Sequence, residues 1–384
     1  MHREVVYQRI QEGRTYLLVP SAPTRKVPPP KEPVFFNPLA RVPRDLSILI
    51  IRGAVQKLGK RVTFADSLAG VGARGLRVAT EVPEIEKVYI NDLNPTSISI
   101  ARKAARINRV SSRCLFSARD CCKFLIDHSG PDERFSIVDV DPFGSPAPFI
   151  DCSLRALHAG GLLCLGATDA TVLCGIYPEI AWRKYHGYSL NTEYCHEIGI
   201  RLILGLTAMT ATRLDLGIVP RFAHVTRNYM RVYVSIRPES SEVQSTASNL
   251  GHILHCFKCG NRILESPVGQ NCNNCGAKMK TSGPLWTASI YDQDLLRYSL
   301  QFHETYFSKE SYRLLALALE EADIATYFVT DKIADKLQVP TPTLEDVIGR
   351  LRLAGFTATR TAFNPRGIRT NAPIKFLYDT IRGP

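Results

Sequence analysis

Short runs of apolar and β-branched residues alternate with helical patterns along the first part of the chain. Three of these runs are RVTFAD from position 61, KVYIND from position 87 and FSIVDVD from position 135, and GLLCLGATD follows from position 161. Helical patterns begin between the runs, at about positions 73, 95 and 148. This alternation predicts an α/β fold in which helices cover both faces of a parallel sheet.

Other patterns mark helix starts and a change of strand direction. Asn94 is a good N-cap and Pro95 suits the first helical position, so the second helix has two start signals. A long helical pattern covers residues 192–214, and two strand-like runs follow at 218–225 and 229–236. We expect these two runs to form an antiparallel hairpin that closes the sheet.

Composition changes indicate how the chain is divided. The segment RPESSEVQSTASNL, residues 237–250, holds four serines and no aromatic residue, as a solvated connector does. A proline-rich segment near the N-terminus is typical of an extended arm. The predicted parts are an arm over residues 1–45, an α/β domain over 46–236, a linker over 237–250 and a C-terminal domain over 251–384.

Charge and hydropathy narrow the class of protein. The 384 residues include 48 Lys and Arg against 36 Asp and Glu, a net charge of +12 that favours a polyanionic partner such as nucleic acid. No stretch has the roughly 18 uninterrupted apolar residues of a membrane span, and no targeting segment is visible at the N-terminus. We therefore expect a cytoplasmic protein with no membrane contact and no obligate protein partner.

A glycine-rich loop follows the first strand run. Gly70, Gly72 and Gly75 form the pattern G-x-G-x-x-G, which lets a backbone approach a ligand at a helix N-terminus. Asp92 ends the next strand run 22 residues after Gly70, where a carboxylate can accept hydrogen bonds from both hydroxyls of an adenosine ribose. Nicotinamide and S-adenosylmethionine proteins both use this arrangement, and the alternative is a tight turn without a ligand.

Three further residues are assigned to this cofactor site. Asp66 ends the strand before the glycine loop, and an acid there suits the ammonium group of S-adenosylmethionine and repels a dinucleotide pyrophosphate. Asp120 precedes a short helix, so it is an N-cap, a ligand of the adenine amino group, or both. Cys121 follows Asp120 and is included with it. S-adenosylmethionine is therefore the predicted cofactor.

A carboxylate also ends the third strand run. Asp141 is followed by Pro142 and Phe143, a rigid turn with an aromatic side chain at the sheet edge where α/β proteins bind ligands. An exocyclic amine of a nucleobase is a poor nucleophile, and Asp141 can orient it and receive its proton while Phe143 stacks on the base. The alternative is a turn in which Asp141 caps the following helix.

The segments DVDPFGSP, ADSLAGVGARG and NDLNP together resemble the tRNA (guanine 26, N2) dimethyltransferase family in its compact archaeal form. FFNPLARVPRD, ATDATVLCG, YCHEIGIRLI and GFTATRTAFNPRGIRTNAP are also similar to that family. The resemblance implies a class I, Rossmann-like methyltransferase domain and a smaller α+β domain that binds tRNA. It also implies that one or two methyl groups are transferred from S-adenosylmethionine to N2 of a guanine.

The resemblance assigns roles to individual residues. It implies that Arg44 binds the carboxylate of the cofactor, that Arg74 and Asp92 belong to the cofactor site, and that Phe35 covers the cofactor. By the same resemblance Asp141 is the catalytic residue beside Phe143.

Four cysteines have the spacing of a metal site. Cys256, Cys259, Cys272 and Cys275 form two C-x2-C pairs separated by 12 residues, and a glycine follows each pair. Four thiolates close a tetrahedral shell around zinc and leave no position for catalysis, so the predicted Zn²⁺ is structural. The alternatives are four reduced thiols or two disulfides. The other seven cysteines, including Cys121 and Cys122, are interpreted as small core residues.

The C-terminal end has the pattern of a winged helix. From Asp331 the sequence predicts a helix, a turn at Pro340 to Pro342 and a second helix, followed by strands around a turn at residues 364–367. Six basic residues are expected on or near its surface for phosphate contacts: Arg350, Arg352, Arg360, Arg366, Arg369 and Lys375. Glu193, His196 and Glu197 also invite a catalytic interpretation, without an identified partner.

Two other functions fit parts of the sequence. An N6-adenine or N4-cytosine methyltransferase uses an Asp/Asn-Pro-Pro-aromatic loop, which DPFG resembles in role although Phe143 replaces the second proline. A zinc-bearing RNA-binding protein without catalytic activity would explain the cysteines and the basic charge, but not Asp92 and Asp141. A nicotinamide oxidoreductase leaves both the DPFG loop and the cysteine pairs unexplained.

Overall fold

The structure is a computed structural model that describes residues 7–21, 34–59, 61–264 and 270–383. The chain packs into two compact units, each built from several segments. Unit 1 holds residues 1–167, 233–238 and 294–313, and unit 2 holds residues 168–232, 239–293 and 314–384. These bounds differ from the predicted ones. Residues 168–232 were expected in the α/β domain and belong to unit 2, and residues 294–313 were expected in the C-terminal domain and belong to unit 1.

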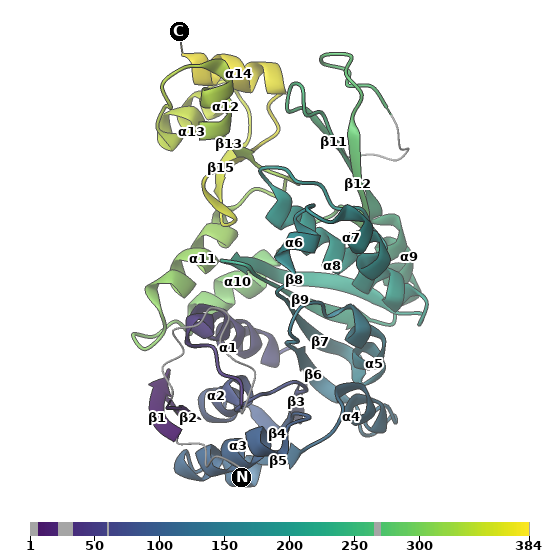
Figure 1. Cartoon of the computed structure of the whole chain (residues 1–384), viewed down its shortest axis with the longest axis vertical. Helices are drawn as coiled ribbons and strands as arrows, with labels where there is room; N and C mark the ends of the chain where they lie inside the picture. The colour runs from purple at the N-terminus through teal and green to yellow at the C-terminus, as the bar shows by residue number, and fades with distance from the viewer. Residues whose placement is uncertain (1–6, 22–33, 60, 265–269, 384) are drawn as a thin grey trace. The chain divides into compact units, whose positions relative to one another are not determined.

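The predicted parallel sheet is present, with strand order β5-β4-β3-β6-β7-β9-β8 (Figure 1). Strand β3 pairs in parallel with β4 and β6, β4 pairs in parallel with β5, and β6 with β7. Only two residues connect β8 and β9, so these strands form the expected hairpin. The strands are β3 (Val62–Asp66), β4 (Ile85–Asn91), β5 (Cys114–Ser117), β6 (Phe135–Val140), β7 (Leu157–Ala167), β8 (Gly217–Thr226) and β9 (Tyr229–Arg237).

Helices cover the strands of unit 1, and the second helix starts as predicted. The Asn94 side chain accepts a hydrogen bond from the Thr96 N–H at 2.9 Å, and Pro95 is the first helical residue. Strands β3 and β6 are buried along nearly their whole length, as expected for a sheet covered on both faces. The helices of the first 155 residues are α1 (Arg41–Val55), α2 (Ala73–Glu81), α3 (Pro95–Ile107), α4 (Cys121–Asp127) and α5 (Ile150–Arg155).

An N-terminal hairpin of β1 (Tyr7–Glu12) and β2 (Thr15–Pro20) is fixed to unit 1 by buried polar groups. Glu12 forms an ion pair with Arg44 of α1 at 2.6 Å, and the Thr15 hydroxyl donates to Glu81 of α2 at 2.8 Å. Arg77 of α2 bridges Glu81 and Asp45. The β1–β2 hairpin therefore packs against α1 and α2. The predicted extended arm falls mostly on residues 22–33, which lie outside the described residues.

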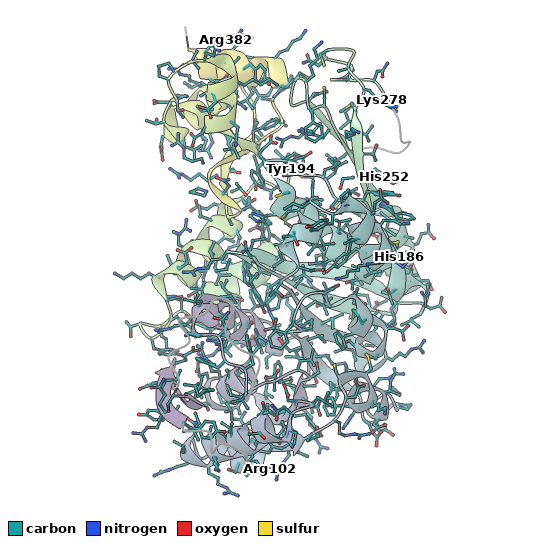
Figure 2. All side chains as sticks on the ribbon, in the orientation of Figure 1. Arg102, His186, Tyr194, His252, Lys278 and Arg382 are labelled. Carbon is teal, nitrogen blue, oxygen red and sulfur yellow. A yellow bond between two sulfur atoms is a disulfide. The ribbon has the colours of Figure 1, made fainter. Side chains whose placement is uncertain are left out.

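Unit 2 contains the long predicted helix and the C-terminal elements. Tyr194 precedes α8, is fully buried, and has its hydroxyl 3.1 Å from Nδ1 of His255 (Figure 2). The helices are α6 (Ala170–Leu173), α7 (Pro178–Tyr185), α8 (Cys195–Thr212), α9 (Ser240–Ser248), α12 (Thr330–Leu337), α13 (Leu344–Leu353) and α14 (Ile374–Arg382). Its smaller sheets contain β10 (Leu250–His255), β11 (Arg262–Leu264), β12 (Lys280–Trp286), β13 (Phe328–Val329), β14 (Ala358–Thr361) and β15 (Asn364–Thr370). Helices α10 (Gln293–Leu300) and α11 (Lys309–Glu320) each contain residues of both units.

Two local predictions are wrong. Residues 240–248 form helix α9, and Thr246 is buried with its hydroxyl 2.8 Å from the Ile218 N–H, so the predicted connector is partly helical and packed. The predicted turn at residues 364–367 belongs to β15, and the chain reverses at Ala362 and Phe363. The Asn-Pro and Arg-Gly pairs resemble turn residues, but β14 and β15 pair across a shorter connection.

Two charged residues that the sequence suggested as functional, Glu197 and Arg369, take part in buried ion pairs. Glu197 of α8 pairs with Arg201 at 2.8 Å and with Arg369 of β15 at 3.0 Å. Arg369 also pairs with Glu321, and only 2% of its side chain is exposed. The two arginines hold the pKa of Glu197 below its usual value, although burial alone would raise it. Arg369 therefore does not lie on the expected basic surface, and Glu197 has a structural partner.

The cysteines outside the C-x2-C pairs are not all free. Cys122 and Cys152 form a disulfide between α4 and α5, which corrects their interpretation as separate core thiols. Cys121 and Cys164 are buried and form no disulfide, in agreement with their interpretation as small core residues. Among the described residues, no helix combines the length and the apolarity needed to cross a membrane.

Candidate cofactor and reaction site

The glycine loop connects β3 to α2 in a conformation that requires glycine. Gly70 and Gly72 have φ values of 54° and 76°, in the left-handed region that side chains rarely adopt. A Cβ on Gly72 would lie 2.9 Å from Cβ of Ala101, and one on Gly70 would lie 3.2 Å from the Phe35 carbonyl oxygen. The loop therefore brings its backbone close to neighbouring segments at the N-terminus of α2.

Asp92 follows β4 and holds this loop. One carboxylate oxygen accepts a hydrogen bond from the Gly70 N–H at 2.7 Å, and the other accepts one from the Asn94 N–H at 2.9 Å. Each carboxylate oxygen has a second acceptor position. Asp92 can therefore fix the loop and still accept hydrogen bonds from two hydroxyl groups of a ligand.

Three acids gather at the carboxyl ends of β3 and β6, around one arginine. Arg74 of α2 forms ion pairs with Asp139 and Asp141, each at 2.9 Å, and Asp66 accepts the Gly75 N–H at 2.8 Å. Burial raises the pKa of Asp66 to about 7, and the neighbouring Asp139 and Asp141 act in the same direction. Because the acids outnumber the nearby cation, this cluster favours a positively charged ligand.

The DPFG turn follows β6 and carries an exposed ring. Phe143 is 52% exposed, and its ring meets that of Phe35 edge to face with centroids 4.5 Å apart. The next helical turn is a 3-10 helix at Ala147–Phe149, and the hydroxyl of Ser145 accepts the N–H of Ala147. The N-cap position of this 3-10 helix is occupied by Pro146, five residues after Asp141.

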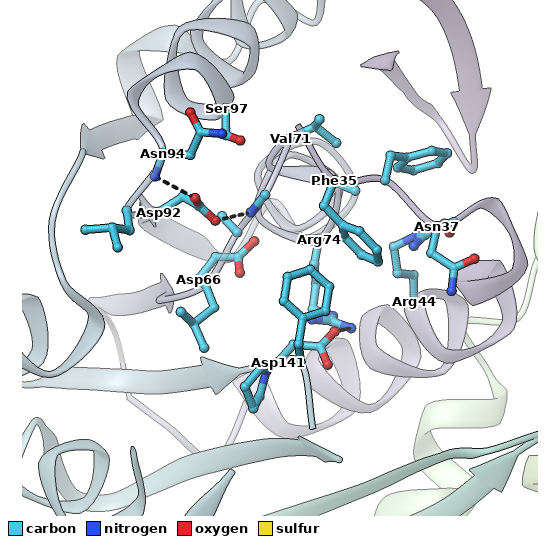
Figure 3. A pocket seen from close by; sticks show the side chains of 18 of the residues that line it. Phe35, Asn37, Arg44, Asp66, Val71, Arg74, Asp92, Asn94, Ser97 and Asp141 are labelled. Atoms are coloured by element: carbon cyan, nitrogen blue, oxygen red, sulfur yellow. Dashed lines mark hydrogen bonds and ion pairs between the residues drawn. The ribbon is translucent and has the colours of Figure 1, made fainter. Parts of the chain in front are cut away.

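These groups line one cavity of about 790 Å³ (Figure 3). The labelled carboxyl groups of Asp66, Asp92 and Asp141 surround the same space in the figure. Nine of the predicted residues line it, namely Phe35, Arg44, Asp66, Gly70, Arg74, Asp92, Asp141, Pro142 and Phe143. This volume lies within the range of cofactor and small-molecule sites.

Three predicted residues are not among those that line the cavity. Gly72 is the N-cap residue of α2 and shapes the loop from behind. Asp120 caps α4 by accepting the Lys123 N–H at 3.0 Å, which is one of its two predicted roles. Cys121 is buried, and burial raises the pKa of its thiol to about 11.

Other lining residues were not found from the sequence. Leu93, Asn94, Pro95 and Ser97 come from the start of α3, and Phe149 lies beyond the DPFG turn. The sequence does predict the N-cap at Asn94. Because this helix start directly follows Asp92, it is the signal that indicates these residues as part of the cavity wall. Arg44 lines the cavity while its guanidinium binds Glu12 at two nitrogens.

The four cysteines of the two C-x2-C pairs come together in unit 2. Sγ of Cys256 lies 3.5 Å from Sγ of Cys275, and Sγ of Cys259 lies 3.5 Å from Sγ of Cys272. All four sulfurs are within 4.8 Å of one another. A tetrahedral zinc site with Zn–S bonds of about 2.3 Å has sulfurs roughly 3.8 Å apart, so this cluster has suitable dimensions.

The sheet and the cavity at its carboxyl edge define the class of protein. Five parallel strands closed by the β8–β9 hairpin, with a glycine loop after β3 and an acid after β4, form the fold of α/β S-adenosylmethionine-dependent methyltransferases. A family model described as N2,N2-dimethylguanosine tRNA methyltransferase matches residues 13–382. The chain belongs to this family.

Individual relatives agree over most of the chain. A tRNA (guanine(26)-N(2))-dimethyltransferase of Methanobrevibacter smithii is 33% identical over 91% of this chain and 91% of its own length. A tRNA (guanine(26)-N(2)/guanine(27)-N(2))-dimethyltransferase of Aquifex aeolicus is 32% identical over 94% and 92%. The solved structure of Trm1 from Pyrococcus horikoshii with S-adenosyl-L-methionine superposes with a TM-score of 0.86, at 29% identity and over 98% of this chain and 100% of that one.

Proposed function

We propose that this protein transfers methyl groups from S-adenosylmethionine to the exocyclic N2 of a guanine in tRNA, at position 26. The observation that carries the proposal is the single cavity lined by Asp92, Asp141 and Phe143. The named relatives support the substrate, since they act on guanine 26 of tRNA. They favour this function over an adenine or cytosine methyltransferase.

The residues of the cavity suit S-adenosylmethionine. Asp92 would accept both ribose hydroxyls, and the backbone at Gly70 leaves room for close approach. Asp66 would bind the cofactor ammonium, because a cation removes the cost of ionising this buried acid beside Asp139. Bound there, the cofactor supplies an electrophilic methyl group on a sulfonium centre.

Arg44 and Phe35 complete this assignment from the other wall of the cavity. Arg44 keeps Glu12 as its partner and would offer its remaining N–H groups to the cofactor carboxylate. Phe35 would cover the cofactor next to Phe143, with which its ring is already in contact. Gly72 shapes the loop, and Asp120, which caps α4, keeps its assignment to the adenine side of the cofactor site together with Cys121.

Asp141 would act on the guanine amine. Its carboxylate would accept a hydrogen bond from the N2 amine, hold the amine toward the cofactor side of the cavity and take the proton that the nitrogen releases. Arg74 would keep the carboxylate in position through its 2.9 Å ion pair. The ring of Phe143, half of which is exposed, would stack on the guanine base next to Pro142.

Removing the Asp92 carboxylate should weaken cofactor binding. We expect Asp92→Ala to lower the affinity for S-adenosylmethionine by about 1.5–3 kcal/mol, since it deletes an acceptor for two hydroxyls and releases the Gly70 loop. Calorimetry with the cofactor alone measures this. Asp151→Ala is the matched control, because Asp151 is an exposed acid of α5 that pairs with Arg155 and is not among the residues that line the cavity, so the affinity should stay unchanged. Equal affinity of Asp92→Ala and wild type would contradict the cofactor assignment.

We assign tRNA binding to the C-terminal part of the chain, residues 251–384, as a zinc-bearing α+β domain. Helices α12 and α13 are joined by a short turn and pack on the antiparallel sheet β13-β15-β14, which supports a winged-helix fold. Arg350, Arg352 and Lys375 are exposed on it. Arg360 pairs with Glu345 and Arg366 with Asp331, so these two arginines are partly neutralised.

A structural Zn²⁺ held by the four cysteines would stabilise this domain. Thiolates are the form that binds zinc, and the four sulfurs lie within 4.8 Å of one another. The positive φ values of Gly260 and Gly276, at 76° and 71°, close both turns.

Methyl transfer to a tRNA transcript tests the function directly. With labelled S-adenosylmethionine, we expect label to enter a transcript that has guanine at position 26. A transcript with adenine at that position should accept much less. Equal labelling of both transcripts would contradict the assignment of position 26.

A further inference from the structure

Unit 2 contains a second cavity, of about 420 Å³, that the methyl-transfer chemistry does not use. Its walls come from the segment before α8, the first C-x2-C turn and the helices α12 and α14. Its lining offers hydroxyl, carboxylate, aromatic and ammonium groups, which are the groups that proteins use to bind nucleotides. They belong to Thr192, Glu193, Phe257, Lys332, Lys336 and Tyr378. This volume is sufficient for one nucleotide.

An exposed aromatic ring stands at this cavity. Phe257 is 53% exposed, although the preceding Cys256 is buried. Its ring meets that of His255 edge to face, with centroids 4.5 Å apart and planes at 77°, so His255 supports the ring on one side. Exposed, fixed aromatic rings are the stacking platforms of proteins that bind unpaired nucleotides.

A buried hydroxyl lines the cavity without a partner among the described residues. Thr192 is 8% exposed, and its Oγ1 makes no hydrogen bond. A buried polar atom left unsatisfied is costly, so this position favours a ligand that can hydrogen-bond to it. The hydroxyl can either donate or accept.

A carboxylate is fixed beside this hydroxyl. Glu193 pairs with Arg262, and the Arg262 guanidinium is sandwiched between Tyr194 and Phe328, 4.1 Å and 3.9 Å from their ring centres. The Glu193 side chain keeps 21% of its surface exposed. The ion pair with Arg262 therefore fixes the Glu193 side chain, which can accept hydrogen bonds from N–H groups of a ligand in the cavity. This gives a role to an acid that the methyl-transfer mechanism leaves unused.

Lysines supply positive charge on α12. Lys332 and Lys336 are four residues apart, so both lie on the helix face that lines the cavity, and both are exposed. Lys336 donates to the Lys258 carbonyl oxygen, which ties α12 to the C-x2-C turn. A phosphate group next to the bound base would bind at these lysines.

We propose that this cavity binds one unpaired nucleotide of the tRNA substrate. Phe257 stacks on the base, Glu193 and Thr192 hydrogen-bond to N–H donors on its edge, and Lys332 and Lys336 contact the adjoining phosphates. Double-helical RNA cannot place a base there, because its bases are stacked and paired. The inference rests on the proposed function, and it makes the cavity a positioning site with no part in the chemistry.

The test is tRNA affinity of the full-length protein, measured by fluorescence anisotropy with a labelled tRNA transcript at several salt concentrations. Phe257→Ala should raise the Kd about tenfold and leave the slope of log Kd against log salt unchanged, because a ring carries no charge. Lys332→Ala should raise the Kd and reduce the slope by about 0.7–0.9, as expected for losing one phosphate contact. The KM for tRNA should rise in parallel in the methylation assay.

Two further variants separate binding from folding. Thr192→Val keeps the shape of the side chain and removes the hydroxyl, so it should raise the Kd several-fold while thermal stability stays equal or rises. Tyr312→Ala is the matched control, since Tyr312 is 51% exposed and lies outside the cavity, and its Kd should stay within about twofold of wild type. If Phe257→Ala loses zinc or unfolds, Thr192→Val decides the outcome.

Unchanged Kd values for Phe257→Ala and Thr192→Val would overturn the proposal and assign the cavity to another ligand, such as a protein segment. The wild-type protein provides the separate check on the function. Failure of wild type to methylate tRNA would count against the proposed function. Normal wild-type methylation with unaffected variants would count against the nucleotide site alone.

Discussion

Asp141→Asn should lower the turnover of tRNA methylation by a factor of about 10² or more, with tRNA and cofactor saturating. The amide keeps an oxygen that can accept a hydrogen bond from the guanine amine, but it cannot take the proton. It also loses the charge that pairs with Arg74 at 2.9 Å. The measurement is single-turnover methyl transfer to a tRNA transcript, with Asp141→Ala alongside.

Binding measurements are needed to interpret this loss. Calorimetry should give S-adenosylmethionine affinities close to wild type for Asp141→Asn, because Asp92 and the glycine loop are untouched. Asp151→Asn is a suitable control, since Asp151 is an exposed acid of α5 that pairs with Arg155. Near-normal turnover by Asp141→Asn would refute the catalytic role and leave the DPFG turn as a structural feature.

Loss of one cysteine from the cluster should destabilise the protein by several kcal/mol, because a structural zinc contributes folding free energy. Cys256→Ser or Cys272→Ser should abolish the stoichiometric zinc that we expect in the wild type, about one ion per chain. Metal analysis and thermal unfolding, with and without a chelator, measure both effects.

A cysteine outside the cluster provides the comparison. Cys114 is also buried, at 8% exposure, and Cys114→Ser should retain zinc and lose far less stability. Wild-type protein that is metal-free, fully folded and equally heat-resistant after chelator treatment would contradict the zinc site.

Much of unit 1 could be predicted because its signals are local. Strand runs, the N-cap at Asn94 and the glycine loop each depend on a few neighbouring residues, and the rule that parallel strands end at one edge brings Asp92 and Asp141 to the same cavity. The roles of Arg44 and Phe35 came only from resemblance, since nothing in their local sequence indicates a cofactor.

The errors concern contacts between residues far apart in the chain. Arg369 was expected on a basic surface because it lies in a sequence rich in arginine. It is instead buried in ion pairs with Glu197 and Glu321, which are 172 and 48 positions away in the sequence. The disulfide between Cys122 and Cys152 likewise depends on how α4 meets α5. The cavity at Phe257 combines four distant segments, so sequence spacing gives no indication of it.

The central claim is methylation of N2 of guanine 26 in tRNA. Mass spectrometry of the nucleosides of a tRNA transcript, incubated with the purified protein and S-adenosylmethionine, tests it most directly. We expect N2-methylguanosine and N2,N2-dimethylguanosine in the wild-type reaction, little of either with Asp141→Ala, and their loss when guanine 26 is replaced. Methylation of adenosine or cytidine instead, or no modified guanosine at all, would contradict it.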